Sequence, residues 1–429
     1  MNNKMTNLYL VFRNKEVLVS FYFLFFILGL SSNTHYHFYD EYRVFEIAIL
    51  LMFGLWATYS RQFIVNKIEL LFFGFIGIGS LFWQQPLFIV ADLLLAYLLV
   101  KSFQVLNYNA LITKAIVLGS FVLFLMLPVA LFDYISSGNY IANWYPLSWN
   151  IRVYNSYFLI VSIFAIWLYA TTTQYKNIYL VFLFLAFFAI LLDGGRSVTL
   201  AYTAFIAIVA VFHKSIRLPL IVSYVGSWLA YLTVTYVASL GSSSLRIARE
   251  SSSGRIDLWV NGLQCWVQNP IMGCGFYQLE QYPHLSAHPH NIFVQVLTEM
   301  GLIGFGFLAF IWFKIARHIS WNIKQNYFVI AALLAVSIDM SLSGVHVYPI
   351  TQMALLWLFV FLLKNPVFVH AHYFNQEPAI ISRFQKLLSI TIYCLIAGWF
   401  IYIMAQVLNS SDVMPMTPPR FWLYGYLLY

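Results

Sequence analysis

Residues 253–275 of this chain read SGRIDLWVNGLQCWVQNPIMGCG, and residues 288–301 read HPHNIFVQVLTEMG. This is the most polar stretch of its length in the sequence, and long apolar runs stand on both sides of it. It contains arginine, which recognises phosphate, and histidine, which exchanges protons near neutral pH. The stretch therefore places two kinds of reactive side chain at a membrane surface.

The composition around this stretch is that of a polytopic membrane protein. Of the 429 residues, 62% are hydrophobic and 9% are charged, and the mean hydropathy is +0.78, whereas a soluble domain carries about 25% charged residues. Because helices satisfy their own backbone polar groups in lipid, we expect an all-α helix bundle. No hydrophilic block is long enough for a separate soluble domain, so we expect a single integral membrane domain over residues 1–429.

Apolar runs of roughly 15–22 residues, the length that a bilayer requires, recur along the chain and predict about 12–13 transmembrane helices. The first run is interpreted as a retained span rather than a signal peptide, because no A-x-A-like cleavage site follows it. The expected spans are residues 17–32, 44–60, 68–83, 87–103, 115–135, 153–172, 178–192, 197–212, 218–240, 291–313, 326–343, 350–363 and 387–408.

The cations divide unequally between the two faces of the predicted bundle. With the N-terminus inside, every lysine falls on the inner face, as the positive-inside rule requires, so the net charge of +8 reports topology rather than nucleic-acid binding. Arginine without lysine favours bidentate anion recognition on the outer face, although chance in a small sample is the alternative. The seven outer cations are Arg43, Arg152, Arg196, Arg246, Arg249, Arg255 and Arg420.

The longest outer loop covers residues 241–290 and is expected to carry active-site residues. Its apolar positions recur at helical spacing, which predicts an amphipathic helix from about Ser253–Gly254 to a point before Pro270. A helix start beside Arg255 would form an anion site, whereas the alternative is that Arg255 only reaches lipid headgroups. The apolar positions are Ile256, Trp259, Val260, Leu263, Trp266 and Val267.

Three further arginines are candidates for binding a diphosphate. Arg196 follows Asp193-Gly194-Gly195 at the outer end of a span, and its alternative role is a structural pair with Asp193. Arg246 and Arg249 could complete a diphosphate clamp, or they could simply be solvated loop residues.

Histidines supply the candidate proton acceptors. His290 precedes Asn291, which opens the next span, so its imidazole is expected at the membrane edge, where it suits a general base. The alternative for His290 is a helix-end histidine that only forms hydrogen bonds. His288 and His346 are weaker candidates, and with Asn291 they could contact the acceptor or the glycan.

The chain offers no clear metal or cofactor site. No acid or cysteine pattern completes a tetrahedral zinc set with the loop histidines, and no D-x-D motif is present for a metal-bound nucleotide sugar. We therefore expect neither metal nor cofactor. For Cys265 and Cys274 we favour two small buried hydrophobes over a disulfide, which would require an oxidising compartment.

Several short motifs, taken in order, resemble the signature of the O-antigen ligase superfamily. That group contains O-antigen ligases, bacterial protein O-oligosaccharyltransferases and O-antigen polymerases. Asp193–Ser197 resembles its small-residue-plus-arginine motif; residues 150–156 resemble an N-x-N-like segment, but Arg152 breaks that pattern. The specific match covers about residues 190–315, and its motifs are Gly254-Arg255, Trp259, Pro270, Gly273-x-Gly275, His290-Asn291, Gln295, Glu299-x-Gly301 and Ile303-Gly304.

The resemblance implies a GT-C-like membrane glycosyltransferase fold in the inner membrane of a Gram-negative bacterium. The donor would be a glycan on undecaprenyl diphosphate, used at the periplasmic face without metal or nucleotide sugar. By the same resemblance His290 would be catalytic, and Arg196 and Arg255 would bind the diphosphate. Direct displacement by an acceptor hydroxyl would invert the anomeric configuration.

The acceptor is the open question. Residues 288–295 and the run VHVYPITQ at residues 345–352 are similar to the protein O-oligosaccharyltransferase versions of these motifs, which favours a pilin-type protein. The length of the chain also fits an O-antigen ligase acting on lipid A-core, and an O-antigen polymerase is a further alternative. A transporter of lipid-linked glycan is the rival from another class, although transporters favour internal repeats and midplane charges.

Overall fold

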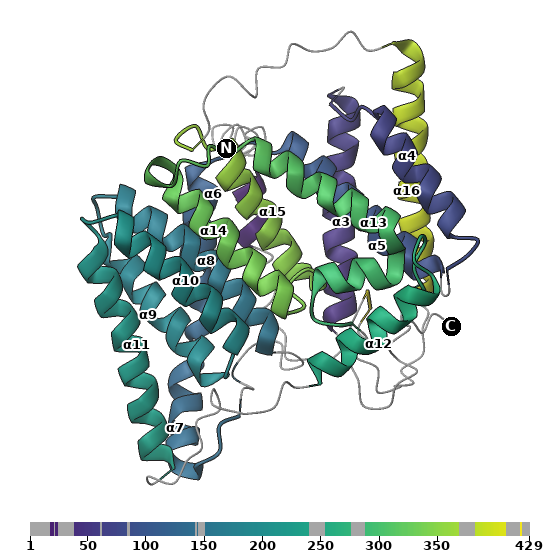
Figure 1. Ribbon diagram of the computed structural model, residues 1–429. Coiled ribbons are helices and arrows are strands. Elements are labelled where there is room, and N and C mark those ends of the chain that lie inside the picture. The colour runs from purple at the N-terminus through teal and green to yellow at the C-terminus, as the bar shows by residue number, and fades with distance from the viewer. Residues whose placement is uncertain are drawn as a thin grey trace, which may run out of the picture. The chain divides into compact units, whose positions relative to one another are not determined.

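The computed structural model of the protein describes residues 18–20, 22–24, 38–60, 62–83, 86–141, 144, 151–239, 254–275, 288–368, 382–408 and 421–422. Within these ranges the regular elements are helices, labelled α3 to α16 with one 3₁₀ segment, η1 (Figure 1). The expected all-α fold is therefore confirmed for the described part of the chain.

The helices form two compact units. The first comprises residues 1–38, 108–250 and 321–339, and the second comprises residues 39–107, 251–320 and 340–429. Each unit is assembled from segments that are distant in the sequence. The single integral membrane domain that we expect over residues 1–429 stays a prediction.

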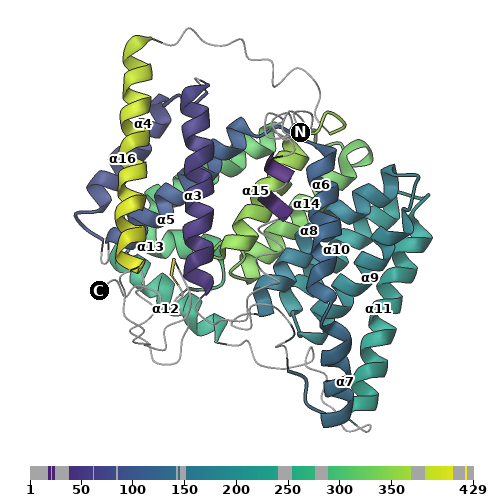
Figure 2. The same ribbon diagram turned by 180° about the vertical axis from the view of Figure 1, so that it is seen from behind.

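In the first unit, α8 and α9 form the packed centre. Both contact α10, α9 also contacts α11, and α6 contacts α8. Most of α8 is buried, as expected for a helix that is apolar on all sides and lies inside a bundle. Figures 1 and 2 both show α11 beside α7, a pair whose residues are in contact. The helices are α6 (Ala110–Gly119), η1 (Ser120–Phe124), α7 (Leu127–Ser137), α8 (Ile151–Thr171), α9 (Asn177–Leu192), α10 (Arg196–Phe212), α11 (Arg217–Ala238) and the greater part of α14 (Ile323–Leu342).

In the second unit, the shorter helix α12 packs on α13, α13 also contacts α4, and α5 contacts both α4 and α15. The phenol of Tyr393 on α16 donates to the carbonyl of Leu51 on α3, which links the first and last described helices of this unit (Figure 2). The helices are α3 (Phe38–Tyr59), α4 (Lys67–Gly79), α5 (Pro86–Val105), α12 (Arg255–Gln268), α13 (Ile292–Arg317), α15 (Pro349–Lys364) and α16 (Arg383–Leu408).

Eight helical segments in the described residues are long and apolar enough to cross a membrane, and α9, α10 and α15 are shorter apolar helices. This confirms a polytopic helical membrane protein, while the count of 12–13 spans stays a prediction. The expected span 115–135 lies within the apolar segment Ala110–Ser137, which is long enough to cross a membrane, but it is not one regular helix, because α6 gives way to η1 and Pro128 is the second residue of α7. Proline lacks the N–H that would continue the helical hydrogen bonds. The expected span 17–32 lies mostly outside the described residues.

Candidate functional site

The histidine motif in the second unit lies at the start of α13. Asn291 is the N-cap, and its side-chain oxygen accepts from the backbone N–H groups of Phe293 and Val294. This cap satisfies two donors that the first helical turn leaves unpaired and so fixes where the helix begins. Immediately before the cap, His288 and His290 are buried, with exposed fractions of 1% and 8%.

His290 adopts an unusual backbone conformation. Its φ is +53°, in the left-handed region that costs free energy for residues with a Cβ atom. Its backbone N–H donates to Nδ1 of His288 at 3.3 Å, and the two imidazole centroids are 4.2 Å apart. Because Nδ1 of His288 accepts this bond, a neutral His288 carries its proton on Nε2. Strained residues of this kind concentrate at functional sites, so the geometry singles out His290.

A second imidazole, that of His346, comes from the turn between α14 and α15. Its centroid is 6.5 Å from that of His288. A Cβ atom at Gly344 in the same turn would lie 3.1 Å from Nε2 of His288 and still closer to its Cε1 atom. The turn therefore fits closely over His288 only because residue 344 is glycine. The structure thus brings His290 and His346 each close to His288.

Two polar residues of α13 reach the His346 imidazole. Nε2 of His346 lies 2.9 Å from Oε1 of Gln295, and Nε2 of Gln295 donates to the Glu299 carboxylate at 3.4 Å. An amide oxygen only accepts hydrogen bonds, so Nε2 of His346 carries the proton. The hydrogen bonds from buried Glu299 through buried Gln295 to the partly exposed His346 therefore select one imidazole tautomer.

The predicted amphipathic helix is confirmed as α12, Arg255–Gln268, which begins after Gly254 with φ +71°. Its buried side differs from the predicted apolar stripe. Leu258 and Gly262 are buried, and a Cβ atom at Gly262 would lie 2.8 Å from Oγ1 of Thr298 on α13. The indole N–H of Trp259 donates to the carbonyl of Pro289 at 2.8 Å, which ties α12 to the histidine motif. The other apolar positions, Ile256, Val260, Leu263 and Val267, are exposed.

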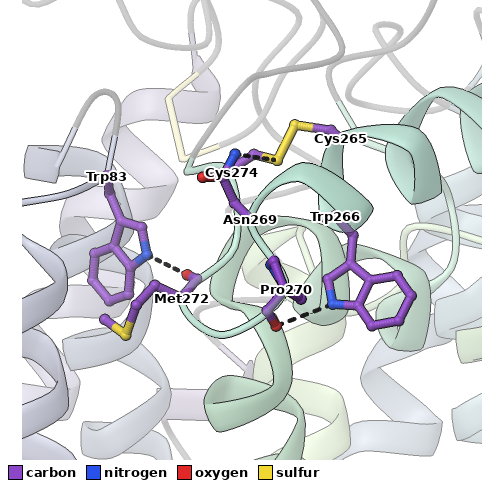
Figure 3. Close-up of a disulfide and its surroundings, with 7 residues drawn as sticks. All are labelled: Trp83, Cys265, Trp266, Asn269, Pro270, Met272 and Cys274. Carbon is purple, nitrogen blue, oxygen red and sulfur yellow. Dashed lines mark hydrogen bonds between the residues drawn. A yellow bond between two sulfur atoms is a disulfide. The ribbon is translucent and has the colours of Figure 1, made fainter.

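The expectation that Cys265 and Cys274 are separate buried hydrophobes is wrong, because they form a disulfide (Figure 3). Asn269 ends α12, and the chain turns back so that the second cysteine meets the last turn of the helix. Figure 3 shows the indole of Trp266 directed at the carbonyl of Pro270, at 3.2 Å, on the same turn. The indole of Trp83 holds the turn through the carbonyl of Met272, at 2.6 Å.

The tethered turn, residues 270–275, pairs with a break in α13. The N–H groups of Cys274 and Gly275 donate to the carbonyls of Thr298 and Glu299, at 2.8 and 3.1 Å. Gly301 has φ +64° and ψ −162° inside the helix, and side chains at Gly273 or Gly301 would overlap the opposing backbone. The glycine motifs of the sequence therefore serve this close backbone approach. The turn supports the part of α13 that carries Gln295 and Glu299.

In the first unit, Arg196 is the first residue of α10. Gly194, with φ +69°, and Gly195, at the N-cap, lead into the helix. Backbone N–H groups at such a helix start favour an anion. The carboxylate of Asp193 accepts from the phenol of Tyr140 at 2.6 Å. Arg196 is partly exposed and is the first residue of this helix, so an anion-compatible helix end and an arginine occur at the same place in the chain.

Asn155 is a polar residue of this region to which the sequence analysis assigned no role. Its side chain is 1% exposed, and its amide nitrogen lies 2.7 Å from the position of a Cβ atom on Gly195. Neither Oδ1 nor Nδ2 has a hydrogen-bond partner among the residues that the structure describes. A buried amide without partners costs free energy and calls for an explanation. The N-x-N-like resemblance of residues 150–156 is the available signal for Asn155, but Arg152 departs from that pattern.

Arg43 does not fit the anion-binding interpretation of the outer arginines. It is 1% exposed, and its side chain forms an ion pair with Glu46 one helical turn along α3. Its remaining donors also bond within the second unit. Sequence reasoning could not detect this role, because most of the acceptors come from remote segments of the chain.

The predicted site residues are distributed over both units. Arg255, His288, His290, Asn291 and His346 belong to the second unit, and Arg196 belongs to the first. Arg246 and Arg249 lie outside the described residues. Within the described ranges, no group of three or more histidine, cysteine, aspartate or glutamate side chains could hold a metal ion.

Comparison with known protein families places this geometry in context. Residues 180–309 match the family model described as O-antigen ligase. This segment includes Arg196, all of α12 and the histidine motif at the start of α13. No curated protein matches the chain at a significant level. Over residues 180–309 the chain is similar to the O-antigen ligase family of membrane glycosyltransferases, which confirms the resemblance that its motifs indicate.

Proposed function

We propose that the protein is a metal-independent, inverting glycosyltransferase that uses a glycan linked to undecaprenyl diphosphate. The acceptor is a hydroxyl group on a pilin-type protein, and the protein is thus an O-oligosaccharyltransferase. The observation that carries the proposal is the strained, buried His290 at the start of α13, inside the segment that matches the O-antigen ligase family.

His290 is the general base in this proposal. Its imidazole takes the proton of the acceptor hydroxyl as the acceptor oxygen forms a bond to the anomeric carbon. The bond between that carbon and the diphosphate oxygen breaks, and the electron pair leaves with undecaprenyl diphosphate. Attack from the side opposite the leaving group inverts the anomeric configuration. His288, Asn291 and His346 contact the acceptor or the glycan.

Arginine binds the leaving group. Arg255 at the start of α12 and Arg196 at the start of α10 are the proposed diphosphate ligands, with Arg246 and Arg249 as further ligands from the loop. Planar guanidinium groups bind phosphate oxygens in pairs and stabilise the charge that develops as the diphosphate leaves. Asn155, whose buried amide adjoins Gly195, adds a hydrogen-bond donor to the Arg196 end.

Two features support a site on the periplasmic side of an inner membrane. The Cys265–Cys274 disulfide is of the kind that persists in oxidising compartments. The exposed apolar positions of α12 suit a helix that lies in the lipid headgroup region. With the lysines assigned to the opposite face, these features agree on the outer orientation of the histidine motif.

The test is transfer by the purified protein in detergent. The protein is incubated in EDTA with undecaprenyl-diphosphate glycan and, separately, with a pilin, with lipid A-core and with a second lipid-linked glycan. We expect glycosylated pilin by mass spectrometry and an inverted anomeric linkage by NMR. Transfer to lipid A-core or chain extension alone would assign the ligase or the polymerase alternative. Movement of the lipid-linked glycan across proteoliposomes, without transfer to any acceptor, would favour the transporter.

A further inference from the structure

The side chain of Arg43 uses all five of its N–H donors inside the second unit. Nε donates to the carbonyl of Phe421 at 3.0 Å. Nη1 donates to the Glu46 carboxylate and to Oε1 of Gln352, and Nη2 donates to the Val347 carbonyl and, at 3.2 Å, to the Tyr39 phenol. A guanidinium has five N–H groups, so none remains for a phosphate.

Two of these acceptors belong to the turn that carries His346 and to the first residues of α15. The Val347 carbonyl follows His346 directly in the chain, and the amide nitrogen of Gln352 donates to the His346 carbonyl at 2.8 Å. The hydroxyl of Thr351 also donates to the Val345 carbonyl. Thr351 therefore holds the backbone before His346, whereas Arg43 and Gln352 hold the backbone after it.

The imidazole of His346 is held separately from α13. Gln295 accepts the proton of Nε2 and donates to Glu299, so the lone pair of a neutral His346 is on Nδ1. The position of the backbone and the tautomer of the ring are thus fixed by two arms of one polar network.

We propose that Arg43 is a positioning residue of the transferase, acting through Gln352 and Val347 on His346. His290 remains the general base, and neutral His346 accepts a hydrogen bond through Nδ1 from a further hydroxyl of the acceptor or the glycan, in the tautomer that Gln295 and Glu299 set. This proposal deepens the proposed function and rests on it for the identity of the reaction. The network itself consists of described contacts within one unit. Among the described residues, the titratable and charged groups that face His346 or lie beyond its direct partners are His288, His290, Glu299, Tyr39, Tyr348, Arg43, Glu46 and Asp92.

The first experiment measures His346 directly and does not depend on transfer. The detergent-purified protein is treated with diethyl pyrocarbonate over a range of pH, and modification of the His346 peptide is followed by mass spectrometry. The rate follows the neutral imidazole and so reports its pKa. In Gln295→Glu a carboxylate accepts the Nε2 proton, and we expect the pKa of His346 to rise by about 1 unit.

The second experiment measures transfer by the same variants over the same pH range. Because only a neutral His346 can accept the hydrogen bond that positions the acceptor or the glycan, the acidic limb of the kcat profile should move to higher pH in Gln295→Glu by the amount that the modification curve moves. The shift should be absent in the double variant Gln295→Glu/His346→Gln. A modification curve in Gln295→Glu that coincides with the wild-type curve would overturn the assigned tautomer.

The role of Arg43 is tested by Arg43→Met, with Gln352→Met as a second variant that leaves the ion pair with Glu46 in place. We expect kcat to fall by about tenfold to 10²-fold, since small misplacements of reacting groups have effects of that size. The KM for the donor should change less than twofold. His346 should be modified several-fold faster, because its turn is no longer held on both sides.

Lys101→Met is the matched control. Lys101 is a buried cation of the second unit that pairs with Glu69 at 2.7 Å, and its two hydrogen-bond acceptors, the Ile64 carbonyl and the Glu69 carboxylate, lie outside the His346 network. This variant should lose thermal stability but keep the wild-type modification rate and pH profile. If Gln352→Met behaves in the same way as Lys101→Met, Arg43 and Gln352 are structural only and the proposal fails. If the modification results hold and no acceptor is glycosylated, the proposed function fails and the network stands.

Discussion

The backbone N–H of His290 donates to Nδ1 of His288, and the two imidazole rings lie 4.2 Å apart at the N-terminus of α13. The bond closes a tight turn across Pro289, and this turn holds His290 in a left-handed conformation. His290 is therefore held by its backbone conformation. His288 accepts a hydrogen bond that fixes the tautomer of its imidazole. The arrangement separates the roles of two neighbouring histidines.

We expect His290→Asn to lower the kcat for glycan transfer by about 10²-fold to 10⁴-fold without loss of folding. Asparagine tolerates the left-handed region better than most residues but has no basic nitrogen, so the substitution removes the general base and keeps the turn. Transfer is measured with the purified protein, and folding by its thermal transition in detergent. His318→Asn, at the other end of α13, is the control. Wild-type turnover in His290→Asn would refute the base assignment.

Arg255→Lys is expected to raise the KM for the lipid diphosphate and to lower kcat/KM by about tenfold or more. Lysine keeps the charge but lacks the planar fork that binds two phosphate oxygens at once. Donor titrations with wild-type and variant protein give both constants. Arg317→Lys at the end of α13 provides the control for a change of the same type. Unchanged constants in Arg255→Lys would mean that this arginine contacts only lipid headgroups.

Asn155→Leu is expected to stabilise the protein and to weaken donor binding. Leucine has a similar size and removes an amide that has no partner among the described residues, which lowers the free-energy cost of burial. If the amide donates to the donor diphosphate, the same change raises the donor KM. The thermal transition with and without undecaprenyl diphosphate measures both effects. A rise in stability with an unchanged donor KM would remove Asn155 from the site.

Loss of the Cys265–Cys274 disulfide is expected to destabilise the second unit. A cross-link that closes a short loop is worth about 2–3 kcal/mol through the entropy of the unfolded chain. The double variant Cys265→Ser/Cys274→Ser should therefore melt at a lower temperature and show reduced transfer. Maleimide labelling of the denatured, non-reduced wild-type protein should modify one cysteine per chain, namely Cys394. Labelling of three cysteines would show that the disulfide is absent.

Gly273→Ala is expected to lower both stability and transfer. The residue has φ +79°, and a Cβ atom there would overlap the backbone of Glu299 and Met300, so the 270–275 turn would move away from α13. The matched control is Gly306→Ala on α13, where an added Cβ atom meets nothing within 4 Å. Alanine at that position favours the helix by roughly 1 kcal/mol. Equal transition temperatures for the two variants would contradict the close approach.

Local sequence features were sufficient to predict several elements. The spacing of apolar residues and Pro270 predicted α12, and His290-Asn291 marked the start of α13, because helix periodicity and capping depend on near neighbours. The break at Gly301 could not be predicted, since a single glycine is compatible with an apolar helix until another backbone approaches it. The disulfide likewise depends on the turn after Asn269, which the spacing of the cysteines does not specify.

The buried role of Arg43 also could not be predicted from local sequence. Near the end of an apolar run an arginine is expected to reach outward, and nothing within a few residues of it indicates otherwise. Its acceptors at Val347, Gln352 and Phe421 lie about 300 or more residues away in the sequence, and only the folded unit brings them together.

The interruption of α13 at Gly301 has a consequence for how such a protein can diversify. In an uninterrupted helix, every tilt or rotation of the lipid-embedded half would also move the histidines at the N-terminal end. With a joint at Gly301, the orientation of the tip depends instead on the short segment clamped beside it. Substitutions in the 270–275 turn can therefore change the orientation of the histidines toward a different hydroxyl-bearing molecule. The half of α13 beyond Gly301 does not need to change.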